Sequence, residues 1–129
     1  MSKAGNAEFR YNLSSEGQMT PKIQATKTPT GTTETIDWND GNFAVIDLGS
    51  ATGDVTLTLS NPVAGAPYFI KFIQGATFRN VIFPSSVKVA GGTAPYTFDV
   101  TETDDAIDIM ALAYDESSQY LANVSQNHA

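Results

Sequence analysis

The sequence predicts an all-β protein: one antiparallel β-sandwich, or a jelly-roll or barrel-like domain, of about eight or nine short strands. From Thr33 onward, apolar and polar residues alternate with the two-residue period of strands, most regularly over residues 55–59. Turn residues (Gly, Pro, Asn and Asp) recur between these short runs. No helical period with capping residues continues for about ten residues. The pattern does not separate a sandwich from a barrel.

The first two strands are expected to form a hairpin around Trp38, the only tryptophan. Residues 33–38 have the pattern of one strand, and residues 43–48 that of the return strand. Between them lies Asp40-Gly41, a pair that favours the left-handed positions of a tight hairpin turn. We interpret Trp38 as an anchor in the core or in a subunit interface.

Further strands are expected, in chain order, at residues 54–60, 68–74, 81–83, 87–89, 96–101, 106–114 and 119–125. In the first of these, Val55, Leu57 and Leu59 should point inward, because they alternate with threonines. Residues 106–114 are the most apolar run and are expected at the centre of a sheet. A helix is the rival interpretation of this run, but its β-branched residues and short length favour a strand.

Two regions are expected in the chain: an extended N-terminal arm, residues 1–32, and a β-domain, residues 33–129. The arm is rich in polar residues and has too little apolar surface to order itself. Phe9, Tyr11 and Leu13 alternate with polar residues. This alternation favours an arm that orders against a neighbouring subunit or a scaffold over a disordered leader. The three residues are therefore interface candidates.

The composition argues against several classes of partner. The net charge of −7 disfavours contact with a phosphate backbone, so no nucleic-acid partner is expected. The absence of cysteine excludes disulfides and thiolate metal sites, and agrees with folding in a reducing cytosol. We find neither a signal-peptide pattern nor an apolar segment of about 20 residues, so we expect no membrane association and no secretory export.

No catalytic motif stands out. The single histidine, His128, is expected in a solvated tail and cannot complete a triad or a metal cluster alone. The clustered acidic residues occupy turn positions, where aspartate bonds to the backbone; they are Asp37, Asp40, Asp47, Asp54, Glu102, Asp104 and Asp105. We therefore expect no enzyme, no cofactor and no metal. A calcium site made only of oxygens between loops remains an alternative.

Asp108 is unusual because it lies inside an apolar strand. We expect it either on the solvent face, or paired with a basic residue such as Lys71 or Arg79 at a subunit contact. Tyrosines are the other binding candidates, since their rings could stack on a sugar, although core or interface positions are favoured; they are Tyr68, Tyr96, Tyr114 and Tyr120.

Five motifs occur in a fixed order: TIDWNDGN at 35–42, VTLTLSNP at 55–62, VIFPSSVK at 81–88, GGTAP at 91–95, and AIDI through YD at 106–115. With these motifs, the chain resembles a small β-domain that recurs in virion proteins of tailed bacteriophages, especially fibres and capsid or tail appendages. The resemblance covers about two thirds of the chain. The family often has a tryptophan and a proline between the lysine and the double glycine, whereas this chain has Val89-Ala90.

The resemblance implies a non-enzymatic structural or attachment role, commonly as a trimer. Taking the 129 residues as the whole chain, we find no heptads or fibrous repeats for a shaft. The layout therefore suits a capsid decoration (cement) protein, or a short head or tail appendage, that binds phage capsid or tail proteins through residues 1–32. Such a protein would reside in the virion after assembly in the bacterial cytoplasm.

A receptor-binding module that recognises host surface glycan through tyrosines and aspartates is the alternative function. Glycan hydrolysis by paired carboxylates is the least favoured hypothesis, because the sequence places no acidic residue in a recognisably buried, apolar environment.

Overall fold

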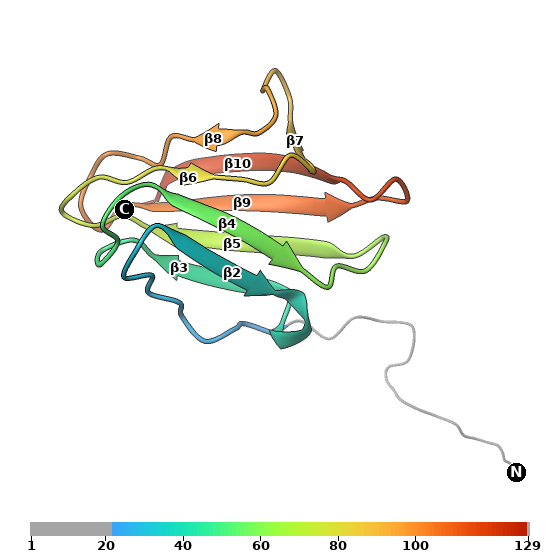
Figure 1. Ribbon diagram of the computed structural model, residues 1–129, viewed down its shortest axis with the longest axis horizontal. Helices are drawn as coiled ribbons and strands as arrows, with labels where there is room; N and C mark the ends of the chain where they lie inside the picture. The colour runs from blue at the N-terminus through green and yellow to red at the C-terminus, as the bar shows by residue number, and fades with distance from the viewer. Residues whose placement is uncertain (1–21, 129) are drawn as a thin grey trace, which may run out of the picture.

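The computed structural model describes residues 22–128, which are nearly all strand and turn (Figure 1). The strands are β2 (Thr33–Asp37), β3 (Phe43–Asp47), β4 (Val55–Ser60), β5 (Pro67–Ile73), β6 (Val81–Ile82), β7 (Val87–Val89), β8 (Thr97–Phe98), β9 (Ile107–Tyr114) and β10 (Tyr120–His128). One short 3-10 helix, η1 (Trp38–Asp40), follows β2. Within this part of the chain, no helix has the length and apolarity needed to cross a membrane. The all-β prediction is confirmed.

The strands form two mixed sheets rather than the expected antiparallel arrangement. A five-stranded sheet has the order β3-β5-β9-β10-β7, and a four-stranded sheet has the order β2-β4-β6-β8. Parallel pairs join β3 to β5, β7 to β10, β2 to β4, and β4 to β6. The remaining pairs are antiparallel.

The predicted hairpin around Trp38 is wrong, because β2 and β3 belong to different sheets. From β2 to β6 the chain alternates between the four-stranded and the five-stranded sheet (Figure 1). Each strand that returns to a sheet therefore runs in the same direction as the strand before it in that sheet. This alternation explains why β2 lies parallel to β4, and β3 parallel to β5.

The crossing from β2 to β3 uses the same residue types as a hairpin turn. The Asp37 carboxylate accepts a hydrogen bond from the backbone N–H of Asn39 at 2.9 Å and caps η1. Gly41 follows, with φ of 142°. A Cβ at Gly41 would lie 2.6 Å from the carbonyl oxygen of Lys22, so only glycine fits here. The Asp-Gly signal therefore marked a tight turn correctly, but that turn leads into the other sheet.

Inward side chains from both sheets form a single core. From the four-stranded sheet come Ile36, Val55, Leu57, Val81 and Phe98, and from the five-stranded sheet come Ala44, Ile46, Tyr68, Ile70, Phe72, Val87, Met110, Leu112 and Tyr120. In β4 the predicted alternation is confirmed, since the threonines are exposed, Val55 and Leu57 are buried, and Leu59 packs partly buried against the core.

β9 confirms the strand interpretation of residues 106–114 and lies at the centre of the five-stranded sheet. The last strand is longer than expected. His128 is the last described residue of β10 and pairs with Ile107, so its predicted place in a tail is wrong, whereas its predicted exposure to solvent is confirmed. The Nε2 atom of His128 lies 2.9 Å from the Ser125 hydroxyl, and its side chain is exposed.

Gly75 offers a test of how closely the loops after β3 and β5 pack. A Cβ at this position would lie 2.7 Å from the Cα atom of Gly49, which is backbone and cannot turn aside. We expect Gly75→Ala to lower the free energy of unfolding by roughly 1–3 kcal/mol through overpacking. Gly31→Ala is the matched control, because nothing lies within 4 Å of its added methyl group. Urea unfolding would measure both, and equal stabilities for the two variants would contradict the close packing.

Candidate interaction surface

The outward faces of the two sheets differ sharply in chemistry. On the four-stranded sheet the outward positions are mostly polar, with a single apolar residue, Ile82; the polar residues are Thr33, Thr35, Asp37, Thr56, Thr58, Ser60 and Thr97. On the five-stranded sheet they are mostly apolar: Phe43, Val45, Pro67, Phe69, Ile73, Ile107, Ile109, Ala111, Ala113 and Leu121. The first face is typical of a sheet that meets water, whereas the second has the composition of a covered sheet.

The strand register places these apolar residues in adjacent rows, which together we call the apolar face. One row runs through Phe43, Phe69, Ala111 and Asn123, and the neighbouring row through Pro67, Ala113, Leu121 and Lys88. The rings of Phe43 and Phe69 stack with centroids 6.0 Å apart. Leu121 is 51% exposed although it is a large apolar side chain. The apolar residues are therefore continuous across β3, β5 and β9 and extend to Leu121 on β10, whereas Asn123 and Lys88 end the two rows.

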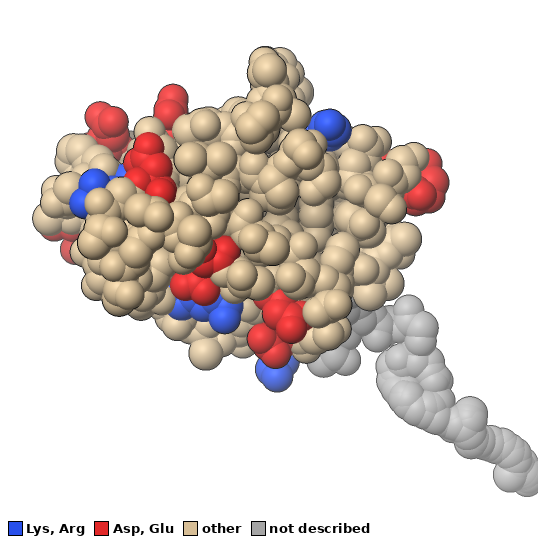
Figure 2. Space-filling view, in the orientation of Figure 1, with Lys and Arg blue, Asp and Glu red and all other residues tan. Residues whose placement is uncertain are grey.

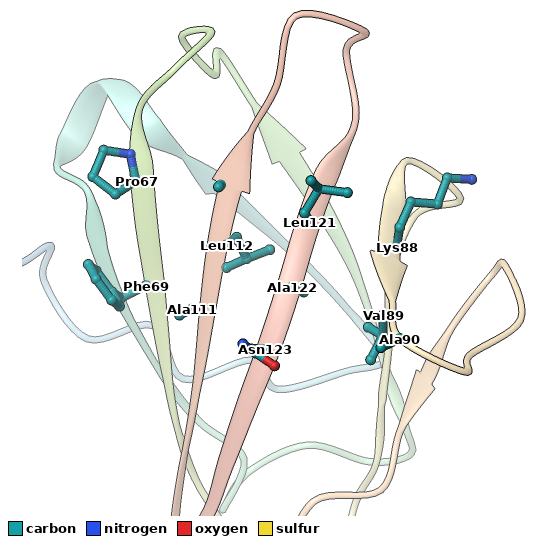
Figure 3. A pocket seen from close by; sticks show the side chains of 11 residues that line it. Pro67, Phe69, Lys88, Val89, Ala90, Ala111, Leu112, Leu121, Ala122 and Asn123 are labelled. Atoms are coloured by element: carbon teal, nitrogen blue, oxygen red, sulfur yellow. The ribbon is translucent and has the colours of Figure 1, made fainter.

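A groove of about 640 Å³ lies in this face, between β5 on one side and β7 on the other (Figure 3). Its lining includes the short side chains of Ala111 and Ala113 on β9. Larger residues rise on both sides: Phe69 and Pro67 from β5, and Leu121 and Lys88 from β10 and β7. The groove thus follows from the placement of small residues on β9 between larger residues on the neighbouring strands β5, β10 and β7.

Charge is sparse on the apolar face. Its charged residues are Lys71 near the middle, Lys88 at the β7 side and Asp47 at the end of β3. The chain as a whole has a net charge of −7. In the view of Figure 2, acidic side chains lie in several separate groups rather than in one continuous patch. With two lysines and one aspartate, the apolar face therefore has a small positive charge on a chain whose net charge is negative.

The described part of the predicted arm is bonded to the edge of the same sheet. Ile23 and Lys27 form parallel bridges with Phe43 and Ile46 of β3. The buried side chain of Gln24 donates hydrogen bonds to the carbonyl oxygens of Asp37 and Gly41, at 2.9 and 2.8 Å. The chain therefore enters the fold beside the apolar face. The interface candidates Phe9, Tyr11 and Leu13 lie outside the described residues.

Trp38 is buried, with 6% of its surface exposed, as the core interpretation predicts. Its ring stacks on Tyr68, with centroids 4.3 Å apart and planes inclined by 24°. Its indole Nε1–H donates a hydrogen bond to the Tyr120 hydroxyl at 3.0 Å. Burial is the main reason that the pKa of Tyr120 is raised to about 12, although the Trp38 bond opposes it. Trp38 thus fastens η1 to both β5 and β10.

Asp108 is fully buried, so its expected place on the solvent face is wrong. One carboxylate oxygen accepts hydrogen bonds from the Thr101 hydroxyl and the Asn127 N–H, both at 2.8 Å. The other accepts from the Thr101 N–H at 2.7 Å and from the Gln126 amide at 3.2 Å. Burial raises the pKa of Asp108, but these hydrogen bonds together outweigh burial and leave the pKa lowered.

The expected partners of Asp108 point elsewhere. Lys71 pairs with Ile109, and therefore projects from the opposite side of the sheet. The guanidinium Nε–H of Arg79 donates to the carbonyl oxygen of Ala51 at 3.2 Å. Polar groups of the 99–101 loop and of the end of β10, rather than a cation, satisfy the carboxylate.

The other binding candidates of the sequence have structural roles. Tyr68 and Tyr120 are buried in the core, and Tyr96 and Tyr114 pack partly buried against it, so the core interpretation of the tyrosines is confirmed. The carboxylates of Asp37, Asp47 and Asp54 accept backbone hydrogen bonds at turns, as expected. Among residues 22–128, no group of three or more His, Asp or Glu side chains is placed to hold a metal ion.

Sequence reasoning missed the apolar face, although a signal for it was present. Residues 68–73 and 106–114 are nearly continuous apolar runs, and a strand with apolar residues on both faces is typical of a sheet covered on both sides. From the sequence we expect residues 106–114 at the centre of a sheet and residues 68–74 simply in a strand, and we assign no outward apolar face to either run. β4 shows the contrasting pattern of a strand with one face in water, because its threonines point outward and alternate with buried apolar residues.

Comparisons of the chain with protein-family models, with curated proteins and with solved structures found no match.

Proposed function

We propose that this chain is a non-enzymatic virion structural protein, either a capsid decoration (cement) protein or a short head or tail appendage. In this proposal it attaches through its N-terminal segment and assembles as a trimer. The observation that carries it is the fixed entry of the chain beside β3, where Lys22 to Lys27 bond along the edge of the five-stranded sheet. The order of the five sequence motifs, and their resemblance to phage virion domains, supports the viral setting.

The anchored segment defines which residues are available for attachment. Residues 22–27 bond to β3, so in this proposal residues 1–21 make the contact with the scaffold. A fully extended segment of that length spans roughly 70 Å. Within it, Phe9, Tyr11 and Leu13 provide an apolar side with the period of a strand. Addition of this strand to an edge on the capsid or tail is the mode of attachment that we propose.

The finer description of the domain is also a proposal: a two-layer β-sandwich rather than a barrel. Two observations support it. Each sheet has a linear strand order with separate edge strands. The two sheets also share one core. A rigid sandwich with an arm at one edge suits a module that stays folded whether or not its arm is engaged.

Membership of the virion can be tested directly. We expect mass spectrometry of virions, purified from the phage that encodes this chain, to find it at a fixed number of copies relative to the major capsid protein. Immunogold labelling would then show whether the copies lie on the head or on the tail. Virions that contain none of the chain, from cells that do express it, would overturn the proposed function.

Attachment through the arm can be tested with one variant and a matched control. We expect the triple variant Phe9→Ala/Tyr11→Ala/Leu13→Ala to bind virions that lack the protein at least roughly tenfold more weakly than the wild type, because apolar anchors carry most of such binding. The control is Arg10→Ala/Asn12→Ala, which alters the alternate positions of the same segment and should bind nearly normally. Co-sedimentation measures both. Full binding by the triple variant would exclude these side chains as the attachment site.

A further inference from the structure

We infer that the apolar face of the five-stranded sheet is the surface on which copies of this chain meet. The inference rests on the proposed homo-oligomeric assembly and deepens it by naming the interface. Its first support is the contrast between the two sheets: threonine covers the outside of the four-stranded sheet, whereas phenylalanine, isoleucine, leucine and alanine cover the outside of the other. A continuous apolar face of this kind marks a surface that another molecule covers.

The size of the face fits a second copy. The five strands have 5, 7, 8, 9 and 3 residues in sheet order, at about 3.3 Å per residue and about 4.8 Å between strands. The face therefore offers roughly 500 Å² per copy, or about 1,000 Å² for two copies, which is about the least expected of a specific interface. A small ligand in the groove would leave most of this area uncovered.

Charge is compatible with contact between copies at this face. Copies with a net charge of −7 repel one another wherever their acidic surfaces meet. The apolar face bears two lysines and one aspartate, Lys71, Lys88 and Asp47, so contact there avoids that repulsion. The cation of Lys71 and the anion of Asp47 lie on neighbouring strands, in adjacent rows, where each can face its opposite on another copy.

The relief of the face is suited to packing against itself. The groove has alanines in its lining, and the large side chains of Phe69 and Leu121 stand beside it (Figure 3). A surface that carries both a protrusion and a hollow can meet copies of itself around a three-fold axis, so that the protrusion of each copy fills the hollow of the next. The same arrangement would bury the exposed part of Leu121, which is otherwise costly in water.

The test introduces a charge into the face and a matched charge outside it. Ile109→Glu places a carboxylate near the middle of the apolar face, and Leu121→Glu places one beside the groove. Thr58→Glu is the control, because Thr58 is exposed on the outside of the other sheet. Light scattering after size exclusion, with sedimentation equilibrium over a range of concentrations, would give the mass and the dissociation constant. The unit mass is 13.8 kDa.

We expect the wild type and Thr58→Glu to form assemblies of more than one copy. In Ile109→Glu and Leu121→Glu, the dissociation constant should rise by roughly 100-fold or more, because each places an unpaired charge at the contact. Circular dichroism would verify that the variants remain folded. We expect Leu121→Glu to fold normally, because Leu121 is half exposed.

Three results would overturn the inference. One is a wild type of 13.8 kDa at every concentration. The second is full assembly of both glutamate variants. The third is assembly that is lost on deletion of residues 2–21 but kept in the glutamate variants, which would assign the contact to the N-terminal segment. A dimer that loses its contact in the variants would support the interface and contradict only the trimer. Virions without the chain would overturn the proposed function and leave the interface standing.

Discussion

Replacing Trp38 with alanine is expected to lower the free energy of unfolding by about 3–5 kcal/mol, the range for deleting a buried aromatic side chain. The indole is 6% exposed and stacks on Tyr68 at 4.3 Å. Its removal leaves a cavity between η1 and the five-stranded sheet. It also leaves the buried Tyr120 hydroxyl without the N–H that now donates to it at 3.0 Å. Urea unfolding followed by circular dichroism would measure the loss, since the variant has no tryptophan fluorescence.

A cycle of milder variants separates packing from the hydrogen bond. Trp38→Phe keeps an aromatic ring and loses the N–H, and Tyr120→Phe keeps the ring and loses the hydroxyl. If the bond matters, the double variant should be more stable than the sum of the two single losses predicts, by about 1 kcal/mol. If the losses of stability in the two single variants simply add in the double variant, this hydrogen bond does not contribute measurably to stability. An unfolding midpoint unchanged in Trp38→Ala would contradict the burial itself.

The fold class was predictable from the sequence because alternation and turn residues are local signals. The inward positions of Val55 and Leu57 and the central place of β9 followed from such signals and are confirmed. The direction of pairing was not predictable in the same way. Asp40-Gly41 favours a reversal of the chain whether the next strand joins the same sheet or crosses to the other one. The turn also contacts residues distant in the sequence, such as Lys22 beside Gly41, and no short-range pattern predicts these contacts.

The candidate surface was less predictable than the fold. A continuous apolar strand has the same sequence pattern whether its second face meets a second layer of the same chain or another molecule. Only the register shows that Phe69 and Ala111 share the outward face of one sheet. The prediction for Asp108 was wrong for a related reason. The groups that donate hydrogen bonds to its carboxylate come from a loop and from the far end of β10, and no short-range sequence pattern connects them to Asp108.

Replacing Asp108 with asparagine is expected to lower the free energy of unfolding at pH 7 by about 2–4 kcal/mol. The ionised carboxylate accepts four hydrogen bonds and donates none. An asparagine amide must turn its NH₂ group toward one pair of these donors, so that buried donors then face a donor. Because Thr101 and Asn127 are both held by Asp108, the loss should loosen the end of β10 and the 99–101 loop together. Hydrogen exchange at these backbone N–H groups would report the local opening.

The loss of stability in Asp108→Asn should depend on pH and should be largest near neutral pH. The folded-state pKa of Asp108 is lowered despite its burial, because its hydrogen bonds favour the charged form. The carboxylate therefore contributes its full stability above the unfolded pKa of about 3.9, and that contribution is lost as the pH falls through the lower folded-state pKa. The difference in stability between wild type and Asp108→Asn should accordingly be constant from neutral pH down to about 5 and shrink below about 4.

Other aspartates also lose stabilising hydrogen bonds in acid, since the pKa values of Asp37 and Asp115 are lowered by bonds from Asn61 and Gln119 respectively. The measurement therefore compares the wild type with the variant at each pH, so that these shared losses cancel. Glu102→Gln removes an exposed charge from the turn before β9 and is the control, with a gap near zero throughout. If the gap for Asp108→Asn kept its full size at the lowest pH at which both proteins fold, the charged carboxylate would not be what holds β10 to the loop. The neutral shape of the side chain would then suffice.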